Sequence, residues 1–418
     1  MILRAALLSL TMGVALIAGQ LSETFTDWLS HPAIQYDTRP VSDPVAELNR
    51  KLRDGTVQLR FDGPSGYLRS VLNALDVPVE SQIAVFLKDS VQAPRINPGN
   101  PRTIFFNDSV AVGWVRGGFV ELAAQDPQQG VVFYSLGQDL LSRAQALVTP
   151  LQFVRRHDCT TCHFNYSTMG VPGMLARSVG QFAVDHRTPI EKRWGGWYVT
   201  GGRSVRHLGN ADPATIFSAS SPGSPLNWPS FDGKFDWTGY LASSSDIAAL
   251  MVFEHQMHMM NLLTRIGWEA RVAAYRDPSV HRDSESAAAT TVSLQDAAKE
   301  TVDYLFFVDE APIAGDIRGS VPFADKFEAR GPRDTKGRTL RQLDLHRRLM
   351  RYPCSYMIYA PQFDALPGEA KEAIYQRMWQ ILSGRERGTR YQRLTIDDRR
   401  AIVEILRDTK KDLPSYFK

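Results

Sequence analysis

Short runs in which apolar and polar residues alternate occupy the chain between about residues 57 and 134. Such runs predict β-strands, because successive side chains of a strand point to opposite faces. Asn-Pro, Asn-Asp, Gly-Gly and Asp-Pro pairs separate the runs and predict turns. The expected strands are residues 57–61, 81–87, 103–106, 110–115, 119–122 and 130–134. Short strands at this spacing predict an antiparallel sheet or a small sandwich.

From about residue 244 onward, apolar residues recur every three or four positions, which predicts helices. The longest expected helix begins at Ser245 or Asp246 and runs to about Ala274. Between residues 247 and 263 its only formally charged side chain is Glu254, so this helix is expected to be buried. The other expected helices are residues 43–53, 67–75, 294–307, 339–351, 367–383 and 395–409, and residues 309–338 are expected to form a charged loop.

The net charge and the N-terminal segment limit the classes of protein to which this chain could belong. The 418 residues include 48 Lys and Arg and 45 Asp and Glu, a net charge of +3, and no dense basic segment predicts a nucleic-acid partner. Arg4 precedes a mostly apolar run that ends in small residues, which predicts a signal peptide over residues 1–21, with an uncleaved anchor as the alternative. The run is short for a membrane span, so no stable span is expected after its removal.

The motif that most clearly indicates a chemical function is Cys159-Thr160-Thr161-Cys162-His163. Two thiols three residues apart can each add to a haem vinyl group, and the adjacent imidazole of His163 can then reach the iron. A thioredoxin-like redox pair would not require His163, and a zinc site would need further ligands nearby. The third cysteine, Cys354, is distant and is expected to be a buried, inert thiol.

This motif resembles the attachment site of c-type cytochromes. The resemblance implies one covalent haem c, with Cys159 and Cys162 as thioether residues and His163 as the proximal iron ligand. It covers only these residues, and the rest of the chain resembles neither a small cytochrome c nor a di-haem peroxidase. Because bacteria attach this haem outside the cytoplasmic membrane, the expected location is the periplasm or another exported compartment, in agreement with the signal peptide. Arg155 and Arg156 are candidates to meet the haem propionates.

The identity of the ligand on the other face of the iron would distinguish an electron-transfer protein from a haem enzyme. The candidates, in order, are His207, His255, His258 and a methionine. The competing interpretation is that each histidine is a hydrogen-bonded core residue. Glu254, His255 and His258 also form a possible non-haem iron set. Glu254 and His255 are adjacent, however, so they point about 100° apart on a helix and cannot easily share one ion.

Together these patterns predict an α+β fold. The expected segments are a signal peptide (1–21), a strand-rich domain (22–147), a haem-attachment segment (148–240) and a helical domain (241–418). The preferred hypothesis is an electron-transfer cytochrome that serves a redox partner protein. The alternative is a haem-c-dependent oxidoreductase or peroxidase acting on a small molecule through an open distal site, with His207 or His255 as acid or base. A sensor, or a subunit docked on a respiratory assembly, is the third hypothesis.

Overall fold

The computed structural model describes residues 28–146, 148–179, 181–202, 205–211, 227–275 and 284–417. The predicted signal peptide lies outside these residues. Within them, an antiparallel sheet of seven strands has the order β6-β5-β4-β3-β2-β1-β9, and β7 and β8 form a separate pair. The strands of the large sheet are β1 (Ile83–Val85), β2 (Arg102–Phe106), β3 (Val110–Trp114), β4 (Val120–Asp126), β5 (Gly130–Leu136), β6 (Val154–Arg155) and β9 (Trp197–Tyr198). The pair is β7 (Ala176–Ser178) and β8 (Gln181–Val184).

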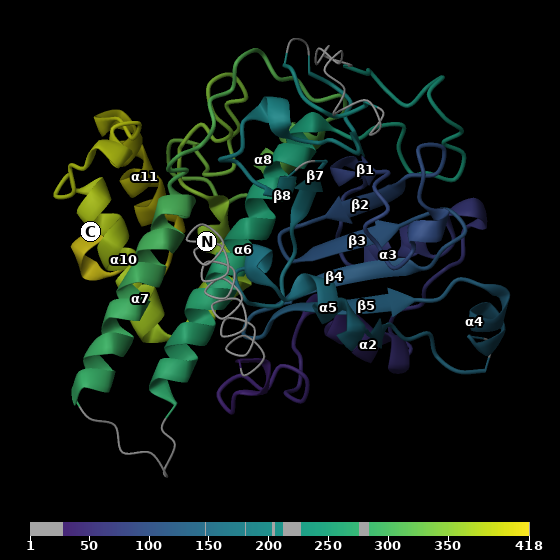
Figure 1. Cartoon of the computed structure of the whole chain (residues 1–418), viewed down its shortest axis with the longest axis horizontal. Helices are drawn as coiled ribbons and strands as arrows, with labels where there is room; N and C mark the ends of the chain where they lie inside the picture. The colour runs from purple at the N-terminus through teal and green to yellow at the C-terminus, as the bar shows by residue number, and fades with distance from the viewer. Residues whose placement is uncertain are drawn as a thin grey trace, which may run out of the picture.

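Most helices follow the sheet in the chain. They are α2 (Pro44–Arg53), α3 (Leu68–Ala74), α4 (Leu140–Gln145), α5 (Thr160–His163), α6 (Ile247–Ala274), α7 (Ser284–Leu305), α8 (Phe323–Ala329), α9 (Pro361–Asp364), α10 (Gly368–Leu382) and α11 (Ile396–Thr409). In Figure 1, α6 runs beside the sheet, α7 lies next to α6, and α10 and α11 form the far end of the molecule. The predicted α+β class, with strands first and helices last, is therefore confirmed.

Alternation along the strands gives the sheet two buried faces. Val112 on β3 and Leu122 on β4 belong to the cluster that packs against α2 and α3. Ile104 and Phe106 on β2 belong to the larger cluster around α6, where the rings of Phe106 and Phe253 lie 4.7 Å apart. Neighbouring residues therefore enter different cores, as period-two patterning requires.

Helix α6 is central because it is apolar on nearly every side. Its cap is Asp246, whose side chain accepts hydrogen bonds from the amides of Ala248 and Ala249. The sheet, α7, α9 and α10 all contact it, so even Glu254 and His255 are buried. Among the described helices, none is both long and apolar enough to cross a membrane.

Two predicted elements are wrong. Residues 57–61 form no strand, since this stretch has no partner strand and the amide of Arg60 instead bonds the hydroxyl of Ser70. Residues 339–351 form turns, not a helix, because distant carboxylates take the amides that a helix would use. Glu328 accepts from Leu343 and Glu310 accepts from Leu349.

The predicted loop at 309–338 contains the short helix α8. The three predicted domains share one hydrophobic cluster, which extends from Ile83 to Phe417, and β9 adds a strand from the middle segment to the sheet. The boundaries at 147/148 and 240/241 stay a prediction.

Candidate functional site

The Cys159–His163 segment is anchored to the edge of the sheet. Strand β6 pairs with β5, and the amide of Arg156 donates to the carbonyl oxygen of Phe133 at 2.8 Å. The chain then turns through His157–Cys159 into α5, which carries the remainder of the motif. A short helical turn brings side chains three residues apart to the same side. Cys159 and Cys162 are therefore held at one location on the sheet.

The cysteines are free thiols in different environments. Cys159 is half-buried and packs against the main core, whereas Cys162 is exposed. Burial, assisted by the negative charge of Asp158, raises the pKa of Cys159 to about 11. A thioredoxin-type pair needs a lowered thiol pKa, so this environment disfavours that interpretation. Cys354 is fully buried, as expected for an inert thiol.

The ring of His163 is oriented by the backbone. Its Nδ1 lies 2.9 Å from the carbonyl oxygen of Gly173, and the amide of Gly173 donates to the carbonyl oxygen of His163 at 2.9 Å. A carbonyl only accepts, so Nδ1 carries the proton and Nε2 keeps its lone pair. Burial lowers the pKa of His163, which keeps the imidazole neutral. A neutral ring with one nitrogen bonded to a carbonyl is the usual state of a metal-ligating histidine.

Helix α6 holds the acceptor of this hydrogen bond in place. Asn261 accepts from the amide of Met174 at 3.2 Å and donates to its carbonyl oxygen at 2.8 Å. A Cβ on Gly173 would lie 2.2 Å from Oδ1 of Asn261, so only glycine fits there without displacement. Gly173 and Asn261 were not among the predicted site residues. The available signals were the Gly170-to-Gly173 turn and the polar Asn261 in an apolar helix.

Beside the motif, the sheet presents small and charged residues. Gly113, Glu121 and Ser135 are directly opposite one another on β3, β4 and β5. Arg102 donates to Glu121 at 3.0 Å, and both side chains are one-fifth exposed. Arg102 lowers the pKa of His163 and Glu121 raises it, while burial contributes most. Small side chains suit the approach of a flat macrocycle, and Arg102 offers a guanidinium for a carboxylate. These residues fit a haem.

The arginines predicted to meet propionates already have partners. Arg155 donates to the carbonyl oxygen of Tyr36 at 2.7 Å and lies over the Tyr36 ring. Arg156 makes a bidentate ion pair with Asp158, with distances of 2.8 and 2.6 Å. To bind a haem propionate, either arginine would have to give up one of these existing contacts.

His255 lies in a buried polar cluster of its own. Its Nδ1 is 2.8 Å from Nδ1 of His186, and its Nε2 is 2.7 Å from the hydroxyl of Ser355. The ring stacks on those of Tyr304 and Phe307. Burial lowers the pKa of His255 to about 3, so the ring is neutral. Both nitrogens are engaged, as the core-histidine interpretation expects, and none of the contacts described for His255 involves the Cys159–His163 segment.

Of the other ranked histidines, His207 is buried, whereas 16% of the His258 side chain is exposed. Nε2 of His258 is 3.2 Å from Nη2 of Arg187, and its Nδ1 is 3.9 Å from the carboxylate of Asp185. His207 packs edge-on against Trp194, with ring centroids 5.4 Å apart. Burial lowers the pKa of His258 and of His207 to about 4. The structure thus separates His207, near β9, from the pair on α6.

The possible non-haem iron set on α6 does not come together. Glu254 forms a buried ion pair with Arg193 at 3.2 Å, whereas His255 and His258 have the other partners given above. Over the described part of the chain, no three His, Cys, Asp or Glu side chains lie close enough to hold a metal ion. Glu254 instead belongs to the packing of α6, where burial raises its pKa to about 7 against the influence of Arg193.

No protein-family model, curated protein or solved structure matches the chain, so the function has to be inferred from these residues alone.

Proposed function

We propose that the protein is an exported monohaem c-type cytochrome that transfers electrons. Cys159 and Cys162 would carry the two thioether bonds of one haem c, and His163 would be the proximal ligand. The observation that carries the proposal is the hydrogen bond between Nδ1 of His163 and the carbonyl oxygen of Gly173. It leaves Nε2 as the nitrogen with a free lone pair, directly after two unpaired thiols at the required spacing.

The surroundings of the motif support electron transfer to a protein. Bound haem would supply a one-electron change between ferric and ferrous iron. Cys162 is exposed, so the cofactor would be attached near the surface, within reach of a redox partner protein. The Arg102–Glu121 pair, one-fifth exposed, would add a polar edge to the same location. Because covalent attachment in bacteria takes place outside the cytoplasmic membrane, we place the protein in the periplasm or another exported compartment.

A second candidate is a haem-c-dependent oxidoreductase or peroxidase with an open distal position and a small-molecule substrate. The observation in its favour is that the two histidines on α6 already have other hydrogen-bond or ion-pair partners, which would leave the distal side of the iron without a histidine from this helix. Both ring nitrogens of His255 have partners at 2.8 and 2.7 Å, and His258 lies between Arg187 and Asp185. Neither is poised as a second ligand. Of the ranked histidines, His207 is the one described above only by a ring contact, with Trp194.

The first experiment is to mature the full chain in a periplasm competent for cytochrome c assembly. Covalent haem is then detected on a denaturing gel and by the pyridine haemochrome spectrum. We expect haem on the parent and on the matched control Cys354→Ala, whose thiol is buried and lies outside the motif. We expect loss or a one-thioether spectrum in Cys159→Ser and Cys162→Ser. A parent without covalent haem would refute both candidates.

Visible spectra of the ferric, ferrous and ferrous-plus-carbon-monoxide forms then separate the two candidates. A low-spin ferrous spectrum unaffected by carbon monoxide supports electron transfer, and immediate binding of carbon monoxide supports the oxidoreductase. If the parent is low-spin, His207→Ala and His255→Asn test the distal ligand. The variant that becomes high-spin identifies it, and two unchanged spectra exclude both histidines.

A further inference from the structure

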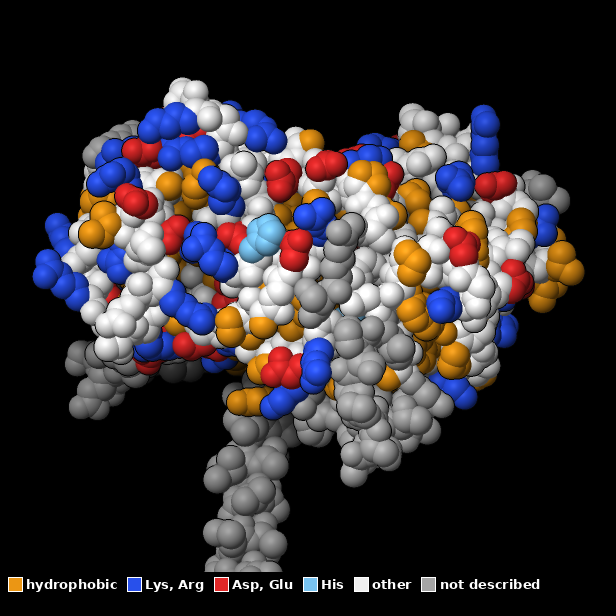
Figure 2. All heavy atoms as spheres, turned by 90° about the horizontal axis from the view of Figure 1, so that it is seen from above, with side chains coloured by type: hydrophobic (Ala, Val, Ile, Leu, Met, Phe, Trp, Pro, Cys, Tyr) orange, Lys and Arg blue, Asp and Glu red, His pale blue; other side chains and the backbone are white. Residues whose placement is uncertain are grey.

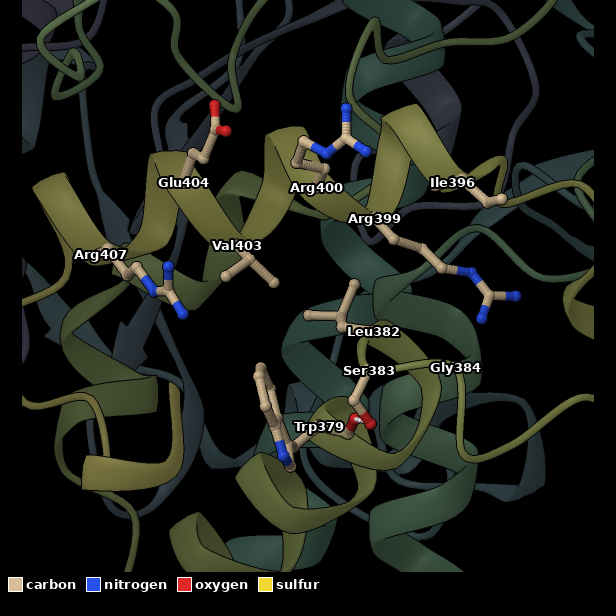
Figure 3. Close-up of a pocket in the computed structure, with 10 residues that line it drawn as sticks. All are labelled: Trp379, Leu382, Ser383, Gly384, Ile396, Arg399, Arg400, Val403, Glu404 and Arg407. Atoms are coloured by element: carbon tan, nitrogen blue, oxygen red, sulfur yellow. Dashed lines mark hydrogen bonds between the residues drawn. The ribbon is translucent and has the colours of Figure 1, made fainter. Parts of the chain in front are cut away.

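A groove between α10 and α11 lies far from the Cys159–His163 segment. In Figure 1 the two helices form the end of the molecule, with α6 and α7 between them and the sheet. The groove holds a cavity of about 320 Å³. Figure 3 shows Trp379, Leu382 and Val403 facing its interior, with arginine side chains around them. The remaining lining residues are Ser383, Gly384, Ile396, Arg399, Arg400, Glu404 and Arg407.

The rim of the groove carries positive charge with little compensation. Arg399 donates to the carbonyl oxygens of Ile381, Leu394 and Tyr391, which are neutral groups. The ion-pair partner of Arg400 is Asp397, at 3.7 Å and with both side chains well exposed, so this pair contributes little.

The third rim arginine, Arg407, donates to the carbonyl oxygen of Phe417. The acidic lining residue, Glu404, is already neutralised by Lys336 at 2.8 Å and Arg338 at 2.7 Å, and hydrogen bonds from both lower its pKa to about 2. Figure 2 shows Lys and Arg side chains over the same end of the molecule.

Apolar and cationic residues alternate along the groove face of α11. Ile396, Arg400, Val403 and Arg407 follow the spacing i, i+4, i+7, i+11, which places them on one stripe of a helix. Ile396 is 76% exposed, unusual for a large apolar side chain. The stripe is about 16 Å long at 1.5 Å per residue, or three helical turns. A groove of this length with a recessed apolar floor is suited to one short amphipathic helix.

We propose that this groove docks an acidic amphipathic helix of a partner protein. Apolar side chains of that helix would cover Trp379, Leu382 and Val403, and its flanking carboxylates would meet Arg400 and Arg407. A second copy of this chain fits less well, because a two-fold contact through the groove would bring the same arginines together. A membrane would touch the rim but not the recessed floor. The proposal does not depend on whether the protein carries haem.

The test uses the full-length protein and a fluorescently labelled 14-residue helical peptide with Leu at i, i+3, i+4 and i+7 and Glu beside them. Matched peptides replace every Glu by Lys or every Leu by Ser. Fluorescence anisotropy measures Kd at low and high salt. We expect binding of the Glu/Leu peptide alone, weakened by salt. Arg400→Glu should weaken it about tenfold, since one reversed contact of 1.4 kcal/mol corresponds to that factor. Val403→Ser should weaken it too.

The control is Arg60→Glu, an exposed reversal away from the groove, which should leave Kd unchanged. Circular dichroism confirms that every variant is folded. Equal loss in Arg60→Glu, or equal binding of the Lys peptide, would refute the proposal. Self-association that Arg400→Glu abolishes would identify a second copy as the occupant instead. Binding to anionic phosphatidylglycerol vesicles without binding to the peptide would identify a membrane.

Discussion

His163 and Gly173 are joined by two reciprocal contacts, one from the imidazole Nδ1 to the Gly173 carbonyl oxygen and one from the Gly173 amide to the His163 carbonyl oxygen, both 2.9 Å long. Asn261 on α6 fixes the next residue, Met174, through its backbone. The orientation of the motif histidine is therefore set by a helix that begins more than 80 residues later in the chain. Residues of the main core therefore support the proposed site.

The first prediction concerns Gly173→Ala. Its new Cβ would lie 2.2 Å from Oδ1 of Asn261, so the turn must shift and the hydrogen bond to His163 must weaken. We expect a larger high-spin fraction in the ferric visible spectrum and a lower midpoint of thermal unfolding. The control is Gly368→Ala in the first turn of α10, where an added Cβ meets nothing within 4 Å. A Gly173→Ala spectrum identical to that of the parent would show that this bond does not orient the ring.

The second prediction concerns Glu121→Gln. A negative charge near the motif stabilises ferric relative to ferrous haem, so its removal should raise the midpoint potential by tens of millivolts. The Arg102 cation that remains acts in the same direction. Potentiometric titration measures the shift, and Glu369→Gln on α10 is the distant control. A potential that stays constant or falls would place the haem away from this face of the sheet.

The third prediction concerns Tyr134→Phe. The Tyr134 hydroxyl donates to Oδ2 of Asp43 at 2.6 Å, while Oδ1 of Asp43 caps α2 through the amides of Val45 and Ala46. Loss of a buried hydrogen bond to a carboxylate should reduce the free energy of unfolding by about 1–3 kcal/mol. Urea denaturation measures the change. Tyr166→Phe, at a mostly exposed tyrosine, should stay within about 0.5 kcal/mol of the parent.

The fourth prediction concerns pH and Glu310. Burial raises the pKa of Glu310 to about 7, although the Leu349 amide and nearby arginines oppose the shift. The folded protein thus binds this proton more tightly than the unfolded chain, so its contribution to stability is present below about pH 4.5 and is lost as pH rises to 7. Glu310→Gln keeps the acceptor for Leu349 but cannot ionise.

Compared with the parent, Glu310→Gln should match in stability near pH 4.5 and be more stable at pH 8, by up to about 3 kcal/mol. The difference between the two urea-unfolding curves across pH isolates this one group from the buried histidines, whose lowered pKa values act in the opposite direction. Glu369→Gln, at an exposed position on α10, is the control for the substitution itself. A constant difference for Glu310→Gln would mean that Glu310 has an ordinary pKa when folded.

The sequence by itself determined the motif, most of the strand segments in the first half of the chain and the long buried helix. Each of these depends on residues close together in the chain, where period, spacing and capping operate. The tertiary structure decided which residues from distant parts of the chain are in contact. Residues 339–351 became turns because carboxylates from elsewhere took their amides, and His255 became a core residue because His186 and Ser355 meet it there. Gly173 acquired its role through Asn261, 88 positions away. Contacts between distant residues form only when the whole core packs, so local patterns carry no record of them.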